Sequence, residues 1–345
     1  MTPDGQLSNI EPTASSQASA TATGDDEKGP EKRHTPQESY DQGAADREFK
    51  LGVVANKRGD YQDALARFTS ARETYERLGL VGSVAVCDYN LGILAVKHGD
   101  HDDALARYGS AREAYERLGR DSKVADCDYN IGFVAMGVSD LVSARARFTS
   151  ARETYERTGH DKRMAGCDYS LGILAKRVGD VVFARARYTS ARETYERVGH
   201  DEGMANCDAN FGNIAWSLGD PVRARAAITS ARETYERLGK DERVAACEFN
   251  LGSFASSLGD LASARAAYES ARETYERLCL LDDVADCDRC IANNTQPLKN
   301  NPAPKAHRML RYVIAPPHAE PVQAGTTYAY DAAGRLTIML LVAVR

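Results

Sequence analysis

The stretch VAVCDYNLGILAVKHGDHDDALARYGSAREAYERLG, residues 84–119, is one unit of a pattern that recurs along the chain with a period of 40 residues. Its most constant part is TSARETYERLG at residues 69–79, which returns five more times with few changes. A catalytic site needs each of its groups once, whereas stacked units must present the same surface to every neighbour. The period therefore predicts a repeat architecture instead of several independent globular domains.

Each unit reads as two helices. Apolar residues recur at steps of three and four over residues 84–95, and Gly99 with Asp100 then ends the pattern as a helix stop and turn. The same spacing returns over residues 104–115 and closes near Gly119. We call the two predicted segments the first and the second helix of a unit.

The order Leu91-Gly92, Ala95, then Ala104 with Tyr108 and Ala111, resembles the tetratricopeptide repeat. That family carries L-G-x-x-Y in its first helix and A-x-x-x-F in its second. The apolar–glycine pair stays in phase in the other units, at Leu51-Gly52, Ile131-Gly132, Leu171-Gly172, Phe211-Gly212 and Leu251-Gly252. The resemblance implies an all-α, right-handed superhelical solenoid of six helix pairs with a C-terminal capping helix.

Glycine is expected where the second helix of a unit crosses closely over the first, with a small residue and a large one opposite it. The small residues are Ala64, Ala104, Ala144, Ala184, Ala224 and Ala264. The large ones are Phe68, Tyr108, Phe148, Tyr188, Ile228 and Tyr268.

The units depart from the family in their 40-residue period, in the missing proline after the second helix and in the missing tryptophan. We expect the second helix to be extended and followed by a longer loop, a form similar to the repeats of kinesin light chain, Pins-type adaptors and bacterial regulators. Acids replace the tryptophan, and we expect each to pair with an arginine of the neighbouring SARETYER segment. They are Asp88, Asp128, Asp168, Asp208 and Glu248.

The expected domain organisation has a disordered tail at residues 1–42, the repeats at residues 43–294 and a proline-rich linker at residues 295–325. The repeat boundaries are 43–80, 81–120, 121–160, 161–200, 201–240 and 241–280, with the cap at 281–294. The end, residues 326–345, resembles a single YD repeat of the Rhs family. One copy cannot build that family's β-shell, and an isolated hairpin is marginal in water.

Composition excludes several classes of function. A formal charge of -6 and a pI of about 5.7 give no basic footprint for nucleic acid. The longest apolar run, residues 336–344, is too short to span a bilayer, so we expect no membrane partner and a cytoplasmic protein. One cysteine per unit, without CxxC pairs, indicates a small buried apolar residue and no metal site. These are Cys87, Cys127, Cys167, Cys207, Cys247 and Cys287, with Cys279 and Cys290 outside the register.

No nucleotide-binding, nucleophile-elbow or zinc-protease motif occurs, and the seven histidines join no recognised catalytic or ligand spacing. We expect no enzyme activity and no cofactor. In the resembled family a partner binds the inner, concave surface lined by the first helices. The candidate residues there are Phe49, Val53, Lys57, Tyr89, Ile93, Lys97, Tyr129, Phe133, Tyr169, Ile173, Lys176, Arg177, Asn213, Trp216 and Phe249.

An apolar surface with a basic rim suits a protein or peptide that carries apolar anchors and acidic residues. The tyrosines also fit a second interpretation, packing between adjacent first helices, and the two do not exclude each other. The leading hypothesis is a non-catalytic scaffold or adaptor. The alternatives are a regulatory sensor that controls a transcription or signalling partner, and a structural protein that self-associates through its ends or outer faces.

Overall fold

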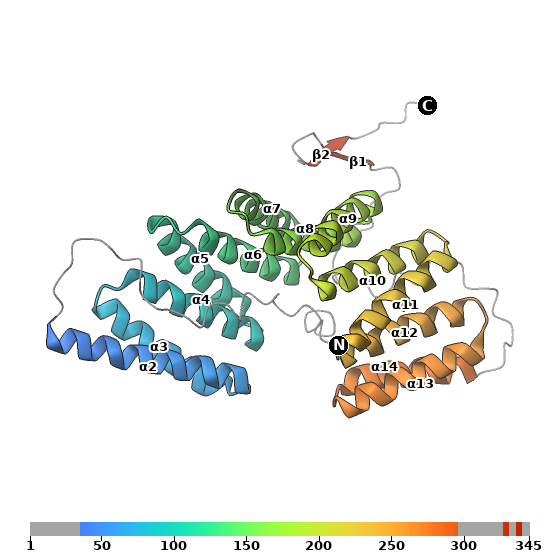
Figure 1. The fold of residues 1–345 in the computed structure, drawn as a ribbon, viewed down its shortest axis with the longest axis horizontal. Helices are drawn as coiled ribbons and strands as arrows, with labels where there is room; N and C mark the ends of the chain where they lie inside the picture. The colour runs from blue at the N-terminus through green and yellow to red at the C-terminus, as the bar shows by residue number, and fades with distance from the viewer. Residues whose placement is uncertain (1–34, 296–326, 331–335, 340–345) are drawn as a thin grey trace. The chain divides into compact units, whose positions relative to one another are not determined.

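The computed structural model describes residues 35–295, 327–330 and 336–339. Thirteen helices follow one another over residues 36–295, and each packs on the helix before it and the helix after it (Figure 1). The helices are α2 (Pro36–Arg58), α3 (Tyr61–Arg77), α4 (Val81–His98), α5 (His101–Arg117), α6 (Asp121–Gly137), α7 (Leu141–Arg157), α8 (Asp161–Arg177), α9 (Val181–Arg197), α10 (Asp201–Ser217), α11 (Pro221–Arg237), α12 (Asp241–Ser257), α13 (Leu261–Arg277) and α14 (Leu281–Thr295).

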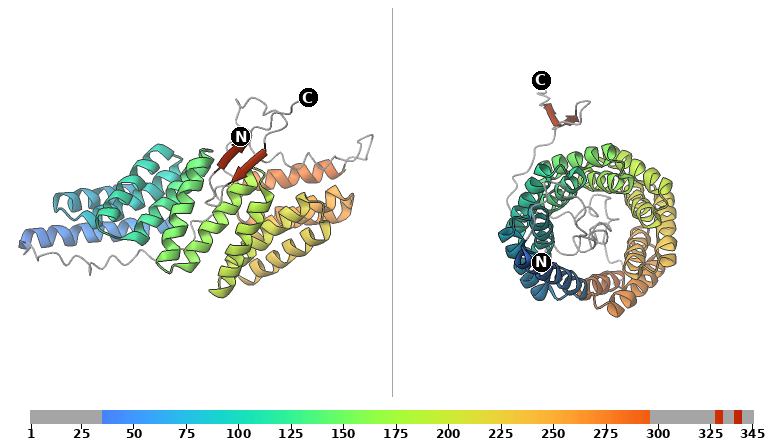
Figure 2. Two further views of the ribbon diagram at one scale, coloured as in Figure 1. Left: turned by 90° about the horizontal axis from the view of Figure 1, so that it is seen from above. Right: turned by 60° about the vertical axis from the view of Figure 1, so that its left-hand side comes forward.

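The predicted solenoid of six helix pairs and a capping helix is confirmed. Even-numbered helices are the first of each pair, odd-numbered helices the second, and α14 closes the array as an unpaired first helix. Seen end on, these helices follow a ring in two concentric layers (Figure 2).

The C-terminal residues form a separate unit in which β1 (Thr327–Tyr330) pairs antiparallel with β2 (Leu336–Met339). This hairpin falls on the YD-like segment. The proposed linker and most of the N-terminal tail lie outside the described residues.

Two boundaries differ from expectation. Helix α2 begins at Pro36, ahead of residue 43, because Thr35 and Glu38 form a capping box and proline occupies the first turn. No long loop follows the second helices. Helix α3 ends at Arg77 and α4 begins at Val81, so the extra residues of the 40-residue period lengthen the helices.

Each second helix begins at an aspartate whose side chain accepts a hydrogen bond from a backbone N–H in the first turn, as Asp100 does from Asp103. The preceding helix usually ends at a glycine in the left-handed region, as at Gly99 (φ 76°). Ser139 (φ 65°) and Cys279 (φ 59°) occupy this conformation without being glycine. The result is a tight antiparallel helix pair in every repeat.

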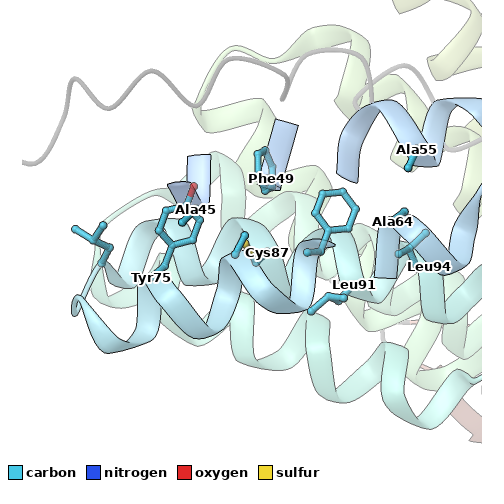
Figure 3. Close-up of a cluster of buried hydrophobic side chains, with 11 residues drawn as sticks. Ala45, Phe49, Ala55, Ala64, Tyr75, Cys87, Leu91 and Leu94 are labelled. Atoms are coloured by element: carbon cyan, nitrogen blue, oxygen red, sulfur yellow. The ribbon is translucent and has the colours of Figure 1, made fainter. Parts of the chain in front are cut away.

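The close crossing of the two helices forms the core of each pair. A Cβ atom placed on Gly172 would lie 2.6 Å from Cε1 of Tyr188, and one on Gly92 would lie 2.8 Å from that of Tyr108. The small residue opposite, Ala184 in the fourth pair, is fully buried. In the first pair, Phe49, Ala55 and Ala64 join this core, and Cys87 and Leu91 of α4 extend it to the next pair (Figure 3).

Buried carboxylates tie the repeats together. Asp128 of α6 is 1 % exposed, and it accepts hydrogen bonds from Arg112 of the preceding repeat (2.9 Å) and from Arg147 and Ser150 of its own (2.7 and 3.0 Å). Asp88 and Asp168 have the equivalent three partners. The predicted pairing with a neighbouring arginine is therefore confirmed.

The constancy of SARETYER follows from these contacts. In the copy at residues 150–157, Ser150 binds the aspartate of its own repeat, while Arg152 binds Asp168 of the next repeat at 2.8 Å. Ala151 and Tyr155 are buried, and Glu156 forms an ion pair with Arg152. Nearly every residue of the segment has a partner that recurs with the period.

The polar ties are weaker in the last two pairs. Ala227 and Ala267 replace the second arginine, and the acids there, Asp208 and Glu248, are 20 % and 15 % exposed. Glu248 lies 3.6 Å from Arg232, whose buried Nε has no hydrogen-bond partner within the described residues. Repeats two to four are thus the most firmly connected part of the array.

The helix crossing leads to a stability prediction. Gly172→Ala should destabilise the fold by about 1–3 kcal/mol, because the added methyl group overlaps the buried ring of Tyr188. Gly109→Ala is the control, since nothing lies within 4 Å of its added Cβ and alanine favours a helix interior by up to about 1 kcal/mol. Thermal unfolding followed by circular dichroism measures both. Equal effects of the two changes would contradict the close crossing.

The carboxylate ties lead to a second prediction. Asp128→Ala should lower the unfolding midpoint by roughly 5 °C, because Arg112 and Arg147 lose their shared partner. Asp288→Ala in α14 removes an acid that is 54 % exposed and should cost below about 1 kcal/mol. An unchanged midpoint in the Asp128 variant would show that these ties do not hold the repeats together.

Candidate binding surface

Adjacent first helices contact each other directly through side chains. Asn130 Nδ2 donates to the Tyr89 hydroxyl at 2.8 Å, and Asn210 Nδ2 donates to that of Tyr169 at 3.0 Å. Between them, Tyr129 Oη lies 3.2 Å from Ser170 Oγ. These bonds draw the first helices together, which is the arrangement expected on the inner side of a curved array.

The inner surface has three levels along each first helix. The first holds the aromatic candidates, whose rings pack on the second helix, with centroid distances of 5.6 Å for Tyr89–Tyr108 and 5.3 Å for Tyr129–Phe148. Phe49 and Tyr129 are buried, while Tyr89, Tyr169 and Phe249 are half-buried. This level therefore packs mainly between helices.

Burial raises the pKa of Tyr169, so its hydroxyl stays protonated within its hydrogen bond to Asn210. Sequence reasoning had missed the polar partners Asn130, Ser170 and Asn210. The available signal was the polar residue that directly follows the aromatic position in each unit.

The second level is apolar in the first four pairs and polar afterwards. Val53, Ile93, Phe133 and Ile173 are half-buried and rest against the repeat cores, so part of each side chain reaches solvent. Asn213 takes the same position in the fifth pair and is also half-buried. A ligand on this level would meet a short apolar strip.

The third level is basic. Lys57, Lys97 and Lys176 are exposed and Arg177 is half-buried, all in the last turn of a first helix, where the helix dipole favours cations. Lys97 lies 4.5 Å from the centre of the Tyr61 ring, and Lys176 donates to Asn210 at 2.9 Å.

Within residues 35–295, none of these four cations forms an ion pair with a carboxylate. Second-helix arginines differ, since Arg72, Arg112 and Arg152 each bind two acids. The inner face therefore carries positive charge that the described protein does not neutralise.

The last two pairs have a different inner surface. Trp216 is half-buried and stacks on Phe254 of the next repeat, with centroids 4.3 Å apart and an interplanar angle of 13°. The stacking joins the fifth and sixth pairs where the tyrosine ladder stops at Ala209. The structure thus places the candidate residues along the first helices, and their role in partner binding stays a prediction.

The cysteines match the expected packing role. The six periodic thiols are buried, whereas Cys279 is exposed and Cys290 half-buried. Burial raises the pKa of Cys87 to about 12 and that of Cys167 well above its usual value. In the part of the chain that the structure describes, no three His, Cys, Asp or Glu side chains are arranged to hold a metal.

None of the helices described here is long and apolar enough to span a bilayer.

Comparisons with known proteins agree with this geometry. Residues 43–117 and 202–277 match the family model of the tetratricopeptide repeat. A search of curated proteins gives no match.

Several solved structures are similar. A Rap protein in complex with competence and sporulation factor has 15 % identity and a TM-score of 0.53, covering 72 % of this chain and 74 % of that one. Aspartyl phosphate phosphatase F from Bacillus subtilis has 12 % identity and a TM-score of 0.58, covering 76 % and 73 %. The quorum sensor NprR from B. thuringiensis has 11 % identity and a TM-score of 0.51, covering 74 % and 77 %. At these identities the likeness is one of fold, and it agrees with the family match: residues 43–117 and 202–277, which fold as helix pairs with a period of 40 residues, are tetratricopeptide repeats.

Proposed function

We propose that residues 36–295 form a non-catalytic scaffold that binds a peptide or helix with apolar anchors and acidic residues along the first helices. The observation that carries this proposal is a row of cations that have no carboxylate partner among residues 35–295, beside the half-buried apolar strip. The cations are Lys57, Lys97, Lys176 and Arg177. Stacked repeats of this kind are typical of interaction modules.

The charge pattern favours an acidic ligand. Carboxylates of a partner gain most where protein cations are not already neutralised, and they steer the encounter from a distance. Apolar anchors would contact Ile93, Phe133 and Ile173. Lys97 and Lys176 lie one helical turn from the two isoleucines. The two levels together provide both charge recognition and buried apolar area.

A second candidate function is a regulatory sensor. One structure of similar fold is titled as a complex with competence and sporulation factor, and another as a quorum sensor. The weaker polar ties at Asp208 and Glu248 give the last two pairs more freedom to change their curvature when a ligand binds. A sensor would use the same inner surface, so the following test applies to both candidates.

The proposal predicts the composition of selected ligands. Random peptides displayed on phage and selected on the full chain should become enriched in Asp and Glu next to large apolar residues. In fluorescence anisotropy, the variant Lys97→Glu/Lys176→Glu should bind the selected peptides about tenfold more weakly, because two attractive contacts become repulsive.

The matched control is Arg117→Glu/Lys162→Glu. It reverses two exposed cations that have no ion pair within residues 35–295 and lie away from the basic level of the first helices. Its affinity should stay within about twofold of the unchanged protein. Selected peptides without acidic residues, or equal losses in the two variants, would contradict binding at the inner surface.

A further inference from the structure

One edge of the solenoid carries an exposed apolar row that neither the fold nor the proposed ligand site uses. Val142, Val182 and Val222, each in the first turn of a second helix, are 77 %, 83 % and 78 % exposed. Four residues at the ends of the preceding first helices extend the row. The complete set, named here the valine edge, is Val138, Val142, Val178, Val182, Leu218, Val222 and Leu258.

The valine edge is continuous because each first helix and its second helix meet at the same edge of the array. Arg177 at the end of α8 donates to the Met136 carbonyl at the end of α6, at 2.8 Å. The guanidinium of Arg145 in α7 lies 4.8 Å from the centre of the Phe183 ring in α9. Hydrogen bonds from Ser263 lower the pKa of Asp260, at the start of α13, and Arg225 of α11 is close enough for its positive charge to lower the pKa of that carboxyl as well. The ends of successive helix pairs therefore adjoin one another along this edge.

The helical turn itself does not require apolar residues at these positions. The first two pairs have Arg58 and Gln62, then His98 and Asp102, where the third to fifth pairs have valine or leucine. The opposite edge is better covered between the repeats, where Val198 and Leu238 are 39 % and 37 % exposed, although Leu281 at the start of the capping helix is 74 % exposed. A row of strongly exposed apolar side chains on a soluble protein indicates an interaction surface.

We propose that the valine edge is the contact between two copies of this chain, related by a two-fold axis. The exposed valine and leucine side chains repeat with the spacing of the helix pairs, so a complementary surface needs protruding apolar side chains at the same spacing. A second copy supplies that spacing, because in a two-fold contact the same row meets itself and the valines of one copy fit between those of the other.

The charges along the edge suit such a self-contact. Asp140 and Asp180 cap the helices beside Val142 and Val182, while Arg185 of α9 and Arg225 of α11 lie in the second turns of their helices. Both signs are therefore present, and an antiparallel pairing can bring acid to base. A row of one sign would repel its copy.

The size of the edge also fits a dimer. Seven exposed apolar side chains over four repeats, with the polar residues between them, offer an area on the order of the 800 Å² that each partner buries in a standard interface. The apolar strip stays free in this arrangement, because it lies on the faces of the first helices, while the basic level borders the valine edge at the ends of those helices.

The test measures the mass of the full chain in solution. Sedimentation equilibrium at about 10 µM should give a dimer. The variant Val142→Glu/Val182→Glu/Val222→Glu should give a monomer, because it places charge in the apolar contact. Glutamate in the first turn of a helix is favourable, so the fold should be retained, as circular dichroism would confirm.

The control Thr149→Glu/Thr189→Glu/Thr229→Glu adds the same charge to the same helices, two turns away from the valine edge, at exposed or half-buried positions. It should remain dimeric. A monomeric parent chain up to about 100 µM, or a valine variant as dimeric as the control, would overturn the proposal. Neither result depends on peptide binding, so the proposed function is tested separately.

Discussion

The close crossing of two helices is the constraint on which the rest of the structure depends. In the fourth pair the backbone of Gly172 rests against the ring of Tyr188, and Ala184 leaves the second helix room to approach. This contact sets the angle between the helices, and therefore which faces remain for the neighbouring pairs. Because the same residue types recur every 40 positions, the same geometry is repeated and the chain curves steadily.

Polar contacts fix the position of each helix pair relative to the next. Asp128 binds an arginine from the preceding pair and an arginine and a serine from its own, so it fixes three helices at once. Apolar packing alone tolerates some sliding, whereas a buried carboxylate needs its donors in place. Where alanine replaces an arginine, at Ala227 and Ala267, the acids become more exposed and the inner surface also changes character.

The fixed scaffold leaves two surfaces on which residues vary. Along the first helices the variation is in charge and apolar area, from Lys97 and Ile93 to Asn213 and Ser253. Along the turns it is a change from His98 and Asp102 to the valines of the later pairs. Both sets of positions lie outside the helix crossing, so their residues can differ between repeats without changing the contact between the two helices of a pair.

Sequence alone determined the helix pairs, their number, the small and large residues at the crossing and the arginine that each acid binds, because all of these recur with the period. It placed the candidate residues on the first helices but could not separate those that pack between helices from those that face solvent. Only the tertiary structure showed that the hydroxyl groups of Tyr89, Tyr129 and Tyr169 lie within bonding distance of the next pair, since those partners come 41 residues later. It also decided which cations have no carboxylate partner in the described part of the chain and which valines stay exposed, because solvent access at one pair depends on what its neighbours cover.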